Sequence, residues 1–478
     1  MPELLRAIDA GTTNLRVCLF SPAGDLLAQA TGAVRTTVPS PGRVEQDATA
    51  IWRGVRQAIT RALTSAGRTA HDLAAIGVTS QRTSAVVWDR PSGRPLTPLV
   101  VWSDLRGLAR AQELQALGIG LAPQQAAAKL EGMLAGLADH RAQDLAFGNI
   151  DSFLIWKLTG GATHATDRSQ AWPTGYLNLA TQDWNPRLME LQGLSLSLFP
   201  TLCDTWGLLG TTTREVLGAV VPITADIADQ QAALIGQGCE TAGAAKVSYG
   251  TSATFNIATG ATFLYPGPST PPFIQSSVGG DTRFCLEGMV YSAGSALDWM
   301  RARFGLGDHR RFEALAAATP DAQGTYLLPA FQGLGAPHGD PTRRGVIGGL
   351  DLGTGPGHLA RAALEGVAFR VREVSDHVAG ATDLPSPQVL KVDGGLTANE
   401  VLMQVQADLL ARPVARHAHR EATACGAAIC AARGVGLLGP AENAGFVRHD
   451  RVFEPRLSVD EAAGRLEIWK AQVYGALP

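Results

Sequence analysis

A strand, a Gly-Thr turn and a second strand follow one another twice in this chain, about half a chain apart. In the first copy apolar segments flank the turn at 9–16, and in the second they flank the turn at 250–252. Two short strands joined by a glycine-containing turn form a hairpin, and recurrence of one unit within a chain indicates internal duplication. We therefore expect two lobes of related design.

Helical and strand-like segments alternate between the two hairpins. Residues 47–66 have the apolar spacing of a helix. The apolar segments that we expect to continue the sheet of the first hairpin are 74–78, 84–88 and 99–102. Such alternation is typical of an α/β layered domain. Glycine is dense and apolar periodicity lapses at 236–243, which predicts an N-terminal lobe of residues 1–238 and a C-terminal lobe of residues 239–478.

Composition narrows the range of functions. The 478 residues carry 40 Lys+Arg against 43 Asp+Glu, a net charge of −3, whereas a nucleic-acid-binding face needs concentrated positive charge. None of the five lysines follows a glycine, which excludes a GxxxxGK phosphate loop. No uncharged run is long enough to span a bilayer. Six cysteines without a CxxC pair favour buried thiols in a cytoplasmic protein.

The first hairpin turn, at 9–16, carries groups that can bind a phosphate without lysine. Its Gly-Thr-Thr sequence offers close backbone approach and two hydroxyls, and Arg16 offers a fork for phosphate oxygens. Asp9 at the strand end could hold Mg²⁺ through water. An ordinary hairpin, in which these side chains make turn hydrogen bonds, fits the segment equally well.

Four later segments carry further groups that could contact a ligand. The turn at 249–252 repeats the glycine and hydroxyls, and small residues at 393–399 follow a strand, so that a flat ligand could lie against the backbone. Polar residues at 80–83 directly follow a buried strand, where α/β folds place ligand contacts. The carboxylate at 227–231 is either a helix N-cap or a base directed at a ligand.

Taken together and in order, these segments resemble the FGGY family of carbohydrate kinases, and within it the glycerol kinases. The matching segments are 9–13 with Arg16, 80–82, 85–89, 100–104, 153–159, 229–233, 249–251, 329–337, 340–345, 391–399 and 424–428. Their shared order and spacing over nearly the whole chain make the resemblance specific.

The resemblance implies an α/β fold of two ribonuclease-H-like lobes, of the actin/hexokinase-like ATPase type, with an interlobe cleft for ATP and a sugar or polyol. By position, Asp229 is implied to be the general base and Asp9 to be associated with Mg²⁺. The residues implied to contact the substrate are Arg82, Thr83, Trp102, Gln124, Asp229 and Gln230. Those implied to contact the phosphates and adenosine of ATP are Thr12, Thr13, Asn14, Arg16, Thr251, Gly294, Asp298, Gly395 and Asn399. Asp298 stands where glycerol kinases usually have glutamine.

Three departures from glycerol kinases concern the substrate pocket. Thr83 replaces an acidic residue, Gln124 replaces a tyrosine, and Thr254 replaces an aromatic wall. Loss of a carboxylate and of two aromatic faces gives a wider and more polar pocket. We therefore expect an acceptor larger than glycerol, such as a longer polyol, a ketose or a sugar acid.

These inferences predict an ATP- and Mg²⁺-dependent cytoplasmic kinase that phosphorylates a terminal hydroxyl of a small polyol or sugar. The resemblance also carries over a homodimer or homotetramer, with neither nucleic acid nor membrane as a partner. A pentulose or other sugar kinase of the same family is one alternative, although pentulose kinases usually have Met-His where this chain has Arg82-Thr83. A non-catalytic sugar- or nucleotide-binding protein on the same fold is another, and the intact Asp9, Asp229 and Asn399 argue against it.

Overall fold

The computed structural model describes residues 3–419, 421–443 and 445–475, and the chain divides into two compact units. Unit 1 comprises Met1–Gly236, Phe273–Thr282 and Thr423–Val447, and unit 2 comprises Gln237–Pro272, Arg283–Ala422 and Arg448–Pro478. The sequence placed the boundary at 238/239, close to the first of these breaks. It did not anticipate that two later segments belong to unit 1.

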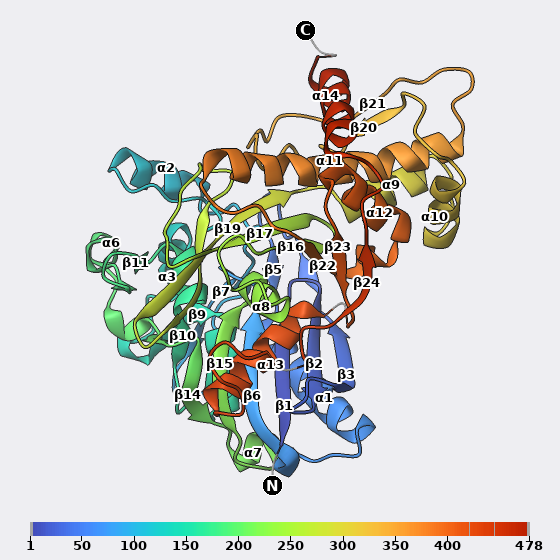
Figure 1. The fold of residues 1–478 in the computed structure, drawn as a ribbon. Coiled ribbons are helices and arrows are strands. Elements are labelled where there is room, and N and C mark those ends of the chain that lie inside the picture. The colour runs from blue at the N-terminus through green and yellow to red at the C-terminus, as the bar shows by residue number, and fades with distance from the viewer. Residues whose placement is uncertain (1–2, 420, 444, 476–478) are drawn as a thin grey trace. The chain divides into compact units, whose positions relative to one another are not determined.

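A six-stranded sheet forms the centre of unit 1 (Figure 1). Its strands, in order, are β14 (Trp206–Thr211), β15 (Pro222–Ala228), β6 (Leu73–Ser80), β1 (Leu4–Ala10), β2 (Asn14–Phe20) and β3 (Leu26–Ala33). The strands β1 and β2 are antiparallel, as the hairpin pattern predicted, and β3 runs antiparallel to β2. In contrast, β6 runs parallel to β1 and β15 runs parallel to β6.

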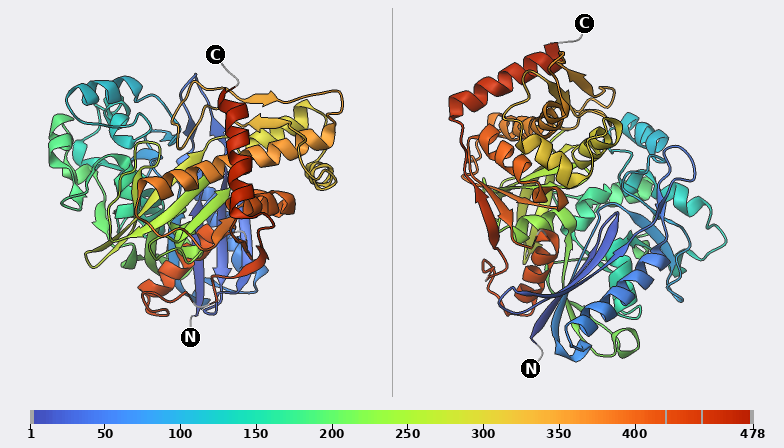
Figure 2. Two further views of the ribbon diagram at one scale, coloured as in Figure 1. Left: turned by 45° about the horizontal axis from the view of Figure 1, so that its top comes forward. Right: turned by 90° about the vertical axis from the view of Figure 1, so that its right-hand side faces the viewer.

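Both faces of this sheet are covered by helices, which explains why every residue of β1 is buried. The helix α1 (Ala48–Ser65) confirms the predicted segment and packs against β2 and β3 (Figure 2). It begins at Asp47, whose carboxylate accepts from the backbone N–H groups of its first turn. The helix α13 (Ala422–Gly434) packs against the other face, where a Cβ at Gly77 would lie 2.3 Å from the carbonyl oxygen of Ala427.

The predicted strands at 84–88 and 99–102 do not continue that sheet, so this expectation was wrong. They belong to a second sheet made of β4 (Thr36–Thr37), β5 (Glu45–Gln46), β8 (Leu99–Val100), β7 (Ala85–Asp89) and β9 (Leu145–Asn149). The physical reason is that both edges of β6 are already paired, one with β1 and the other with β15. The chain turns away after β6, with Thr83 at a φ of 56°, and β7 pairs with β9 and β8.

Short elements complete unit 1 within the described residues. The helices are α2 (Leu108–Ala116), α3 (Leu130–Ala135), α4 (Ile150–Leu158), α5 (Arg168–Ala171), α6 (Pro186–Leu191), α7 (Arg214–Leu217) and α8 (Asp229–Gly236). The paired strands are β10 (Ala165–Asp167) with β13 (Thr201–Cys203), and β11 (Leu177–Asn178) with β12 (Asp183–Trp184). The strand β18 (Pro272–Val278) brings Phe273 into this unit.

The sheet of unit 2 repeats the arrangement of unit 1. Six neighbouring strands of this seven-stranded sheet are, in order, β19 (Asp281–Val290), β17 (Ala253–Gly260), β16 (Ala245–Tyr249), β22 (Leu390–Asp393), β23 (Val414–His417) and β24 (His449–Phe453). Each neighbouring pair in this series is parallel or antiparallel in the same way as the corresponding pair of unit 1, where the strands are taken in the order β3, β2, β1, β6, β15 and β14. The duplication that the two hairpins predicted is therefore present in the topology.

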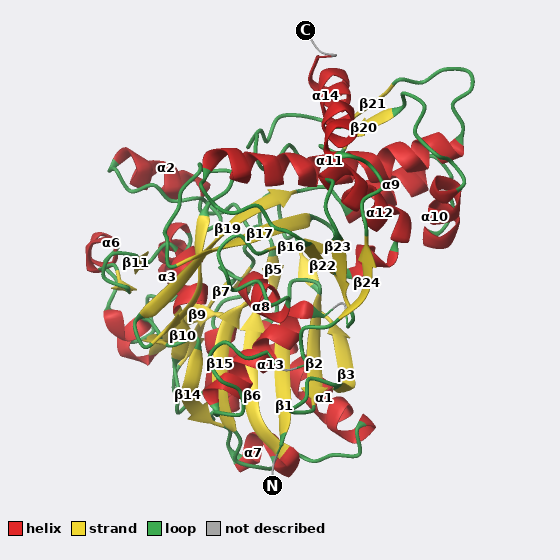
Figure 3. Ribbon diagram, viewed as in Figure 1, coloured by secondary structure: helices red, strands yellow, loops and turns green. Residues whose placement is uncertain are grey.

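Long helices dominate the remainder of unit 2 (Figure 3). They are α9 (Gly294–Arg303), α10 (His309–Ala317), α11 (Pro356–Ala381), α12 (Glu400–Leu410) and α14 (Val459–Gly475), with a small sheet of β20 (Tyr326–Leu328) and β21 (Val346–Gly348). The helix α11 packs against α12 and against β20. Across the described residues, we find no helix that combines the length and the apolar character needed to cross a bilayer.

Candidate active site

Three parallel strands of unit 1 end at the same edge of the sheet. Ala10 of β1 and Ala228 of β15 both pair with Ser80 of β6, so the carboxyl ends of the three strands are level. Neighbouring strands are about 4.8 Å apart. The three segments that follow these strands, Gly11 onward, Gln81 onward and Asp229 onward, therefore begin side by side, at the edge where open α/β sheets bind ligands.

The Asp229 carboxylate lies against Arg82 at this edge. Oδ1 of Asp229 is 3.6 Å from Nε of Arg82, and the two side chains are 25% and 13% exposed. The same Oδ1 accepts from the backbone N–H of Gln230 at 2.8 Å. A carboxylate that is accessible and held in one orientation is suited to accept a proton from a hydroxyl.

Phe273 lies against Arg82, a contact that the sequence did not reveal. The guanidinium carbon of Arg82 lies 4.5 Å from the centre of the Phe273 ring, a cation–π contact. Arg82 is thus held between an aromatic face and the carboxylate of Asp229. Nothing in the sequence could have indicated this contact, because Phe273 is far along the chain and in no motif.

The predicted phosphate hairpin joins β1 to β2. Asp9 and Arg16 are cross-strand partners, and Nη1 of Arg16 lies 3.6 Å from Oδ2 of Asp9. Thr13 and Asn14 at the tip are exposed. The turn thus offers hydroxyl, amide and guanidinium donors beside one carboxylate, which suits a phosphate with an associated cation.

The other predicted acceptor-site residues differ in their surroundings. Trp102 is 38% exposed, and its Nε1 donates to Oγ1 of Thr12 at 3.0 Å. Thr83 is nearly buried in its left-handed turn. Gln124 is exposed. The neighbouring Gln125 accepts from the backbone N–H of Ala122 and donates to the carbonyl oxygen of Pro173.

The second hairpin of the chain, which joins β16 to β17 in unit 2, packs closely on the start of α9. The backbone N–H groups of Ala293 and Ser295 both donate to the carbonyl oxygen of Thr251 at 3.1 Å. A Cβ at Gly294 would lie 2.6 Å from the carbonyl oxygen of Gly250. Only glycine fits at position 294, which explains its place between hairpin and helix.

The turn after β22 leaves its backbone open. Gly394 has a φ of 92°, and a Cβ there would lie 2.4 Å from the carbonyl oxygen of Tyr249. A Cβ at Gly395, in contrast, would meet no heavy atom within 4 Å. Asn399 caps α12 by accepting the backbone N–H of Leu402 at 2.8 Å. The exposed backbone at Gly395 is a surface on which a flat ligand can lie.

Asp298 lies on α9 within the same unit. Its Oδ1 accepts from Nη2 of Arg301 at 2.6 Å, and its side chain is 59% exposed.

Within the described ranges no group of three or more histidine, cysteine or acidic side chains could hold a metal ion. A cation bound together with a nucleotide would therefore be coordinated mainly by phosphate oxygens and water, as Mg²⁺ is in many phosphoryl-transfer enzymes.

Comparison with known proteins agrees with this fold. Residues 4–236 match the N-terminal domain of the FGGY family of carbohydrate kinases, and residues 245–435 match its C-terminal domain. A glycerol kinase of Alkalilimnicola ehrlichii is 39% identical over 491 residues, which cover 99% of this chain and 98% of that protein. These matches are similarities of sequence over the full length of both proteins.

Solved structures show the same fold. Plasmodium falciparum glycerol kinase with ADP superimposes with a TM-score of 0.90 at 24% identity, and it covers 99% of this chain and 98% of its own. A ligand-bound xylulose kinase from Lactobacillus acidophilus gives a TM-score of 0.86 at 21% identity with the same coverage. Both share the actin/hexokinase-like ATPase fold of two sheet-rich domains.

Together with the duplicated fold, these matches define a sugar or polyol kinase, a phosphotransferase with an alcohol group as acceptor. The chain belongs to the FGGY family of carbohydrate kinases. It is similar to glycerol kinases and uses ATP as phosphate donor, as this family does.

Proposed function

We propose that the enzyme transfers the terminal phosphoryl group of ATP to a terminal hydroxyl of a small polyol or sugar, with Asp229 as general base. The observation that carries this proposal is the accessible Asp229 carboxylate, oriented by Arg82 and by the N–H of Gln230. Phosphoryl transfer requires alignment and charge stabilisation more than covalent chemistry. A carboxylate that accepts the hydroxyl proton supplies the remaining requirement.

We further propose that Arg82, Thr83, Trp102, Gln124, Gln230 and Phe273 contact the acceptor. Thr83 and Gln124 stand where glycerol kinases have an acidic residue and a tyrosine, and both give the acceptor more room. Phe273 supports Arg82 with an aromatic face within unit 1. Thr254, which stands where glycerol kinases have an aromatic wall, is buried in β17. An acceptor of four to six carbons suits this pocket better than glycerol.

For the nucleotide we propose two groups of contacts. Thr13, Asn14 and Arg16 in unit 1, with the backbone at Thr12, contact the phosphates, and Asp9 holds Mg²⁺ through water. In unit 2 the contacts are Thr251, Gly294, Asp298, Gly395 and Asn399. Mg²⁺ would neutralise charge on the phosphates. The open backbone of Gly395 supports an adenosine contact at that turn.

The proposed function is tested by ADP release with glycerol and with a panel of four- to six-carbon polyols, ketoses including pentuloses, and sugar acids. We expect strong stimulation by one of the longer acceptors. Preference for glycerol would contradict the larger pocket, and preference for a pentulose would select the pentulose kinase alternative. Nucleotide binding without stimulation by any acceptor would favour a non-catalytic binding protein.

The role of Asp229 is tested by Asp229→Asn. Loss of the base should lower turnover by about 10²–10⁴-fold and leave ATP binding nearly unchanged. Asp204→Asn is a matched control, because Asp204 also lies beside an arginine of unit 1, with its Oδ1 3.8 Å from Nη1 of Arg168. Full activity of Asp229→Asn would exclude Asp229 as the base.

We also propose a cytoplasmic location and assembly into homodimers or homotetramers. The chain has only six cysteines in 478 residues and no CxxC pair, which supports a reducing environment. Size-exclusion chromatography with light scattering tests the assembly, and a monomer at micromolar concentration would contradict it.

A further inference from the structure

We propose that Gln46 and Gln81 are positioning residues, which hold Thr12 and Trp102 in place through one closed network of hydrogen bonds. This inference rests on the proposed function. It adds Gln46, which no motif of the sequence had indicated, and gives a role to Gln81, which lies in the polar segment 80–83. All members of the network lie in unit 1.

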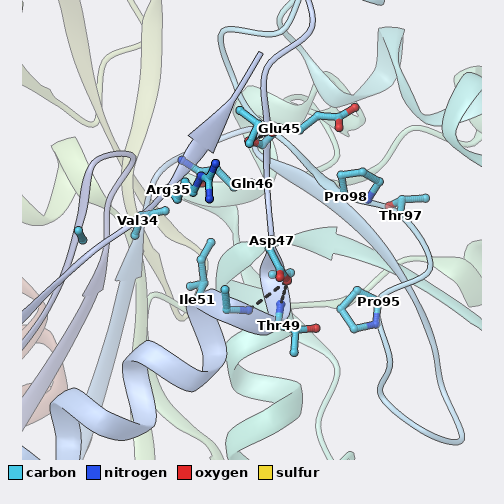
Figure 4. Close-up of a pocket in the computed structure, with 14 residues that line it drawn as sticks. Val34, Arg35, Glu45, Gln46, Asp47, Thr49, Ile51, Pro95, Thr97 and Pro98 are labelled. Carbon is cyan, nitrogen blue, oxygen red and sulfur yellow. Dashed lines mark hydrogen bonds between the residues drawn. The ribbon is translucent and has the colours of Figure 1, made fainter. Parts of the chain in front are cut away.

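Gln46 determines which groups of the network donate and which accept hydrogen bonds. It is 2% exposed, and it lies in the wall of a hollow of about 740 Å³ beside the start of α1 (Figure 4). Its Nε2 donates to the backbone carbonyl oxygen of Thr12 at 2.7 Å and to Oγ1 of Thr36 at 2.9 Å. Because a backbone carbonyl can only accept, Nε2 must face Thr12, and Oε1 must face Gln81.

Gln81 extends the same order of donors and acceptors to Thr12 and Ser84. It is 1% exposed, and its Nε2 donates to Oε1 of Gln46 at 2.9 Å. Its Oε1 accepts from Oγ1 of Thr12 and from Oγ of Ser84, both at 3.0 Å. A hydroxyl has a single hydrogen to donate, so both hydroxyls are committed to the same amide oxygen.

The same two hydroxyls hold Trp102. Nε1 of Trp102 donates to Oγ1 of Thr12 at 3.0 Å, and its backbone N–H donates to Oγ of Ser84 at 3.1 Å. The indole ring is therefore fixed at two points by groups that Gln81 orients. Four chain segments that are distant in sequence meet in this network, so a change at Gln46 reaches Trp102 through Thr12 or Gln81.

The network also changes the role of Thr12. Its only hydroxyl hydrogen is directed at Gln81, so this hydroxyl does not donate to a phosphate oxygen. The exposed Thr13 beside it is the hydroxyl donor for phosphate. Thr12 thus acts on the acceptor side, through Trp102, whereas Thr13 acts on the nucleotide side.

This difference is measurable as a split between two Michaelis constants. Thr12→Val should raise the KM for the acceptor at least about five-fold and leave the KM for ATP within about two-fold, whereas Thr13→Val should do the reverse. Thr212→Val is the matched control, because Oγ1 of Thr212, like that of Thr12, donates one hydrogen bond and accepts another, in this case with two backbone groups at 2.9 Å. It should leave both constants unchanged. A rise in the ATP constant alone for Thr12→Val would overturn the assignment.

A second measurement does not depend on turnover. With 5-fluorotryptophan incorporated, the ¹⁹F resonance of Trp102 is identified by its loss in Trp102→Phe. We expect this resonance to move in Gln46→Met and in Gln81→Met and to stay in place in Thr212→Val. An unmoved resonance in the two glutamine variants would overturn the network. If the wild type phosphorylated no acceptor, the proposed function would fail, whereas the ¹⁹F result would still decide the role of the glutamines.

Discussion

Asp151 and Asp226 are two interacting carboxyl groups inside unit 1, both without solvent exposure. Two buried carboxyl groups that interact cannot both be ionised without a large energetic cost, so we expect one of them to be protonated. Burial raises the pKa of both side chains, and the Asp151 carboxyl raises the pKa of Asp226 further. Asp226 lies on β15, whose end leads directly into Asp229.

Replacing Asp226 by asparagine should therefore stabilise the protein at neutral and higher pH. An unfolded aspartate loses its proton near pH 4, whereas the folded pair keeps one, so the folded state loses stability as pH rises above that value. The asparagine side chain can still accept from the backbone N–H of Asp167, which lies 2.9 Å from Oδ2 of Asp226. We expect Asp226→Asn to add about 1–2 kcal/mol to the free energy of unfolding at pH 8.

Urea denaturation between pH 4 and pH 8 measures this effect. The gain should decline toward pH 4, where both states hold the proton. The exposed Asp321→Asn serves as control and should show no such trend. A gain of equal size at every pH would show that the two carboxyl groups do not share a proton.

Arg6 is a second buried charge in the same unit. It is fully buried in β1, and among the described residues none forms a hydrogen bond with its three side-chain nitrogens. Burial lowers the pKa of this guanidinium to about 9. An isolated buried charge is costly, so Arg6→Met should raise the free energy of unfolding at pH 7 by about 1–3 kcal/mol.

Thermal and urea unfolding of Arg6→Met test this. The benefit should shrink above pH 9, because the wild-type side chain is then neutral in the folded state. Arg53→Met, on the exposed side of α1, should change the free energy of unfolding by no more than about 0.5 kcal/mol. Destabilisation by Arg6→Met would reveal a favourable role for the charge.

Thr83 is the position at which acceptor preference can be moved. Glycerol kinases have an acidic residue there, so Thr83→Glu should raise kcat/KM for glycerol relative to the longer acceptors about ten-fold, through hydrogen bonds from the glycerol hydroxyls to the carboxylate. Thr83→Gln has nearly the same size without the charge. Equal effects of Glu and Gln on the ratio would mean that size rather than charge decides preference.

The adjacent glycines 394 and 395 should respond differently to alanine. Gly394→Ala places a Cβ 2.4 Å from the carbonyl oxygen of Tyr249 at a φ of 92°, so we expect a loss of stability of at least about 2 kcal/mol. Gly395→Ala meets no protein atom within 4 Å and should keep the melting temperature. It should nevertheless raise the KM for ATP several-fold, because the methyl group occupies the proposed nucleotide surface. An unchanged ATP constant for Gly395→Ala would remove that turn from the nucleotide site.

The glycine turns, the helix beginning after Asp47 and the duplicated hairpins could be recognised from the sequence. Each depends on residues close together in the chain, such as a capping carboxylate or a glycine at a tight turn, and local preferences determine them. The family resemblance could also be recognised from the sequence, because each matching segment consists of residues that are close together in the chain. Asp229 and Arg82 were chosen by motif, and the structure brings their side chains together.

Other features depended on contacts between distant parts of the chain. Phe273 lies against Arg82, α13 covers β6 from the far end of the sequence, and Gln46 bonds to Thr12. The sheet that holds β7 also depended on long-range pairing, because β1 and β15 occupy both edges of β6. The sequence by itself determined which chemical groups are available and which turns present them. Only the tertiary structure decided which groups meet, because burial and long-range hydrogen bonds join residues whose separation along the chain carries no pattern.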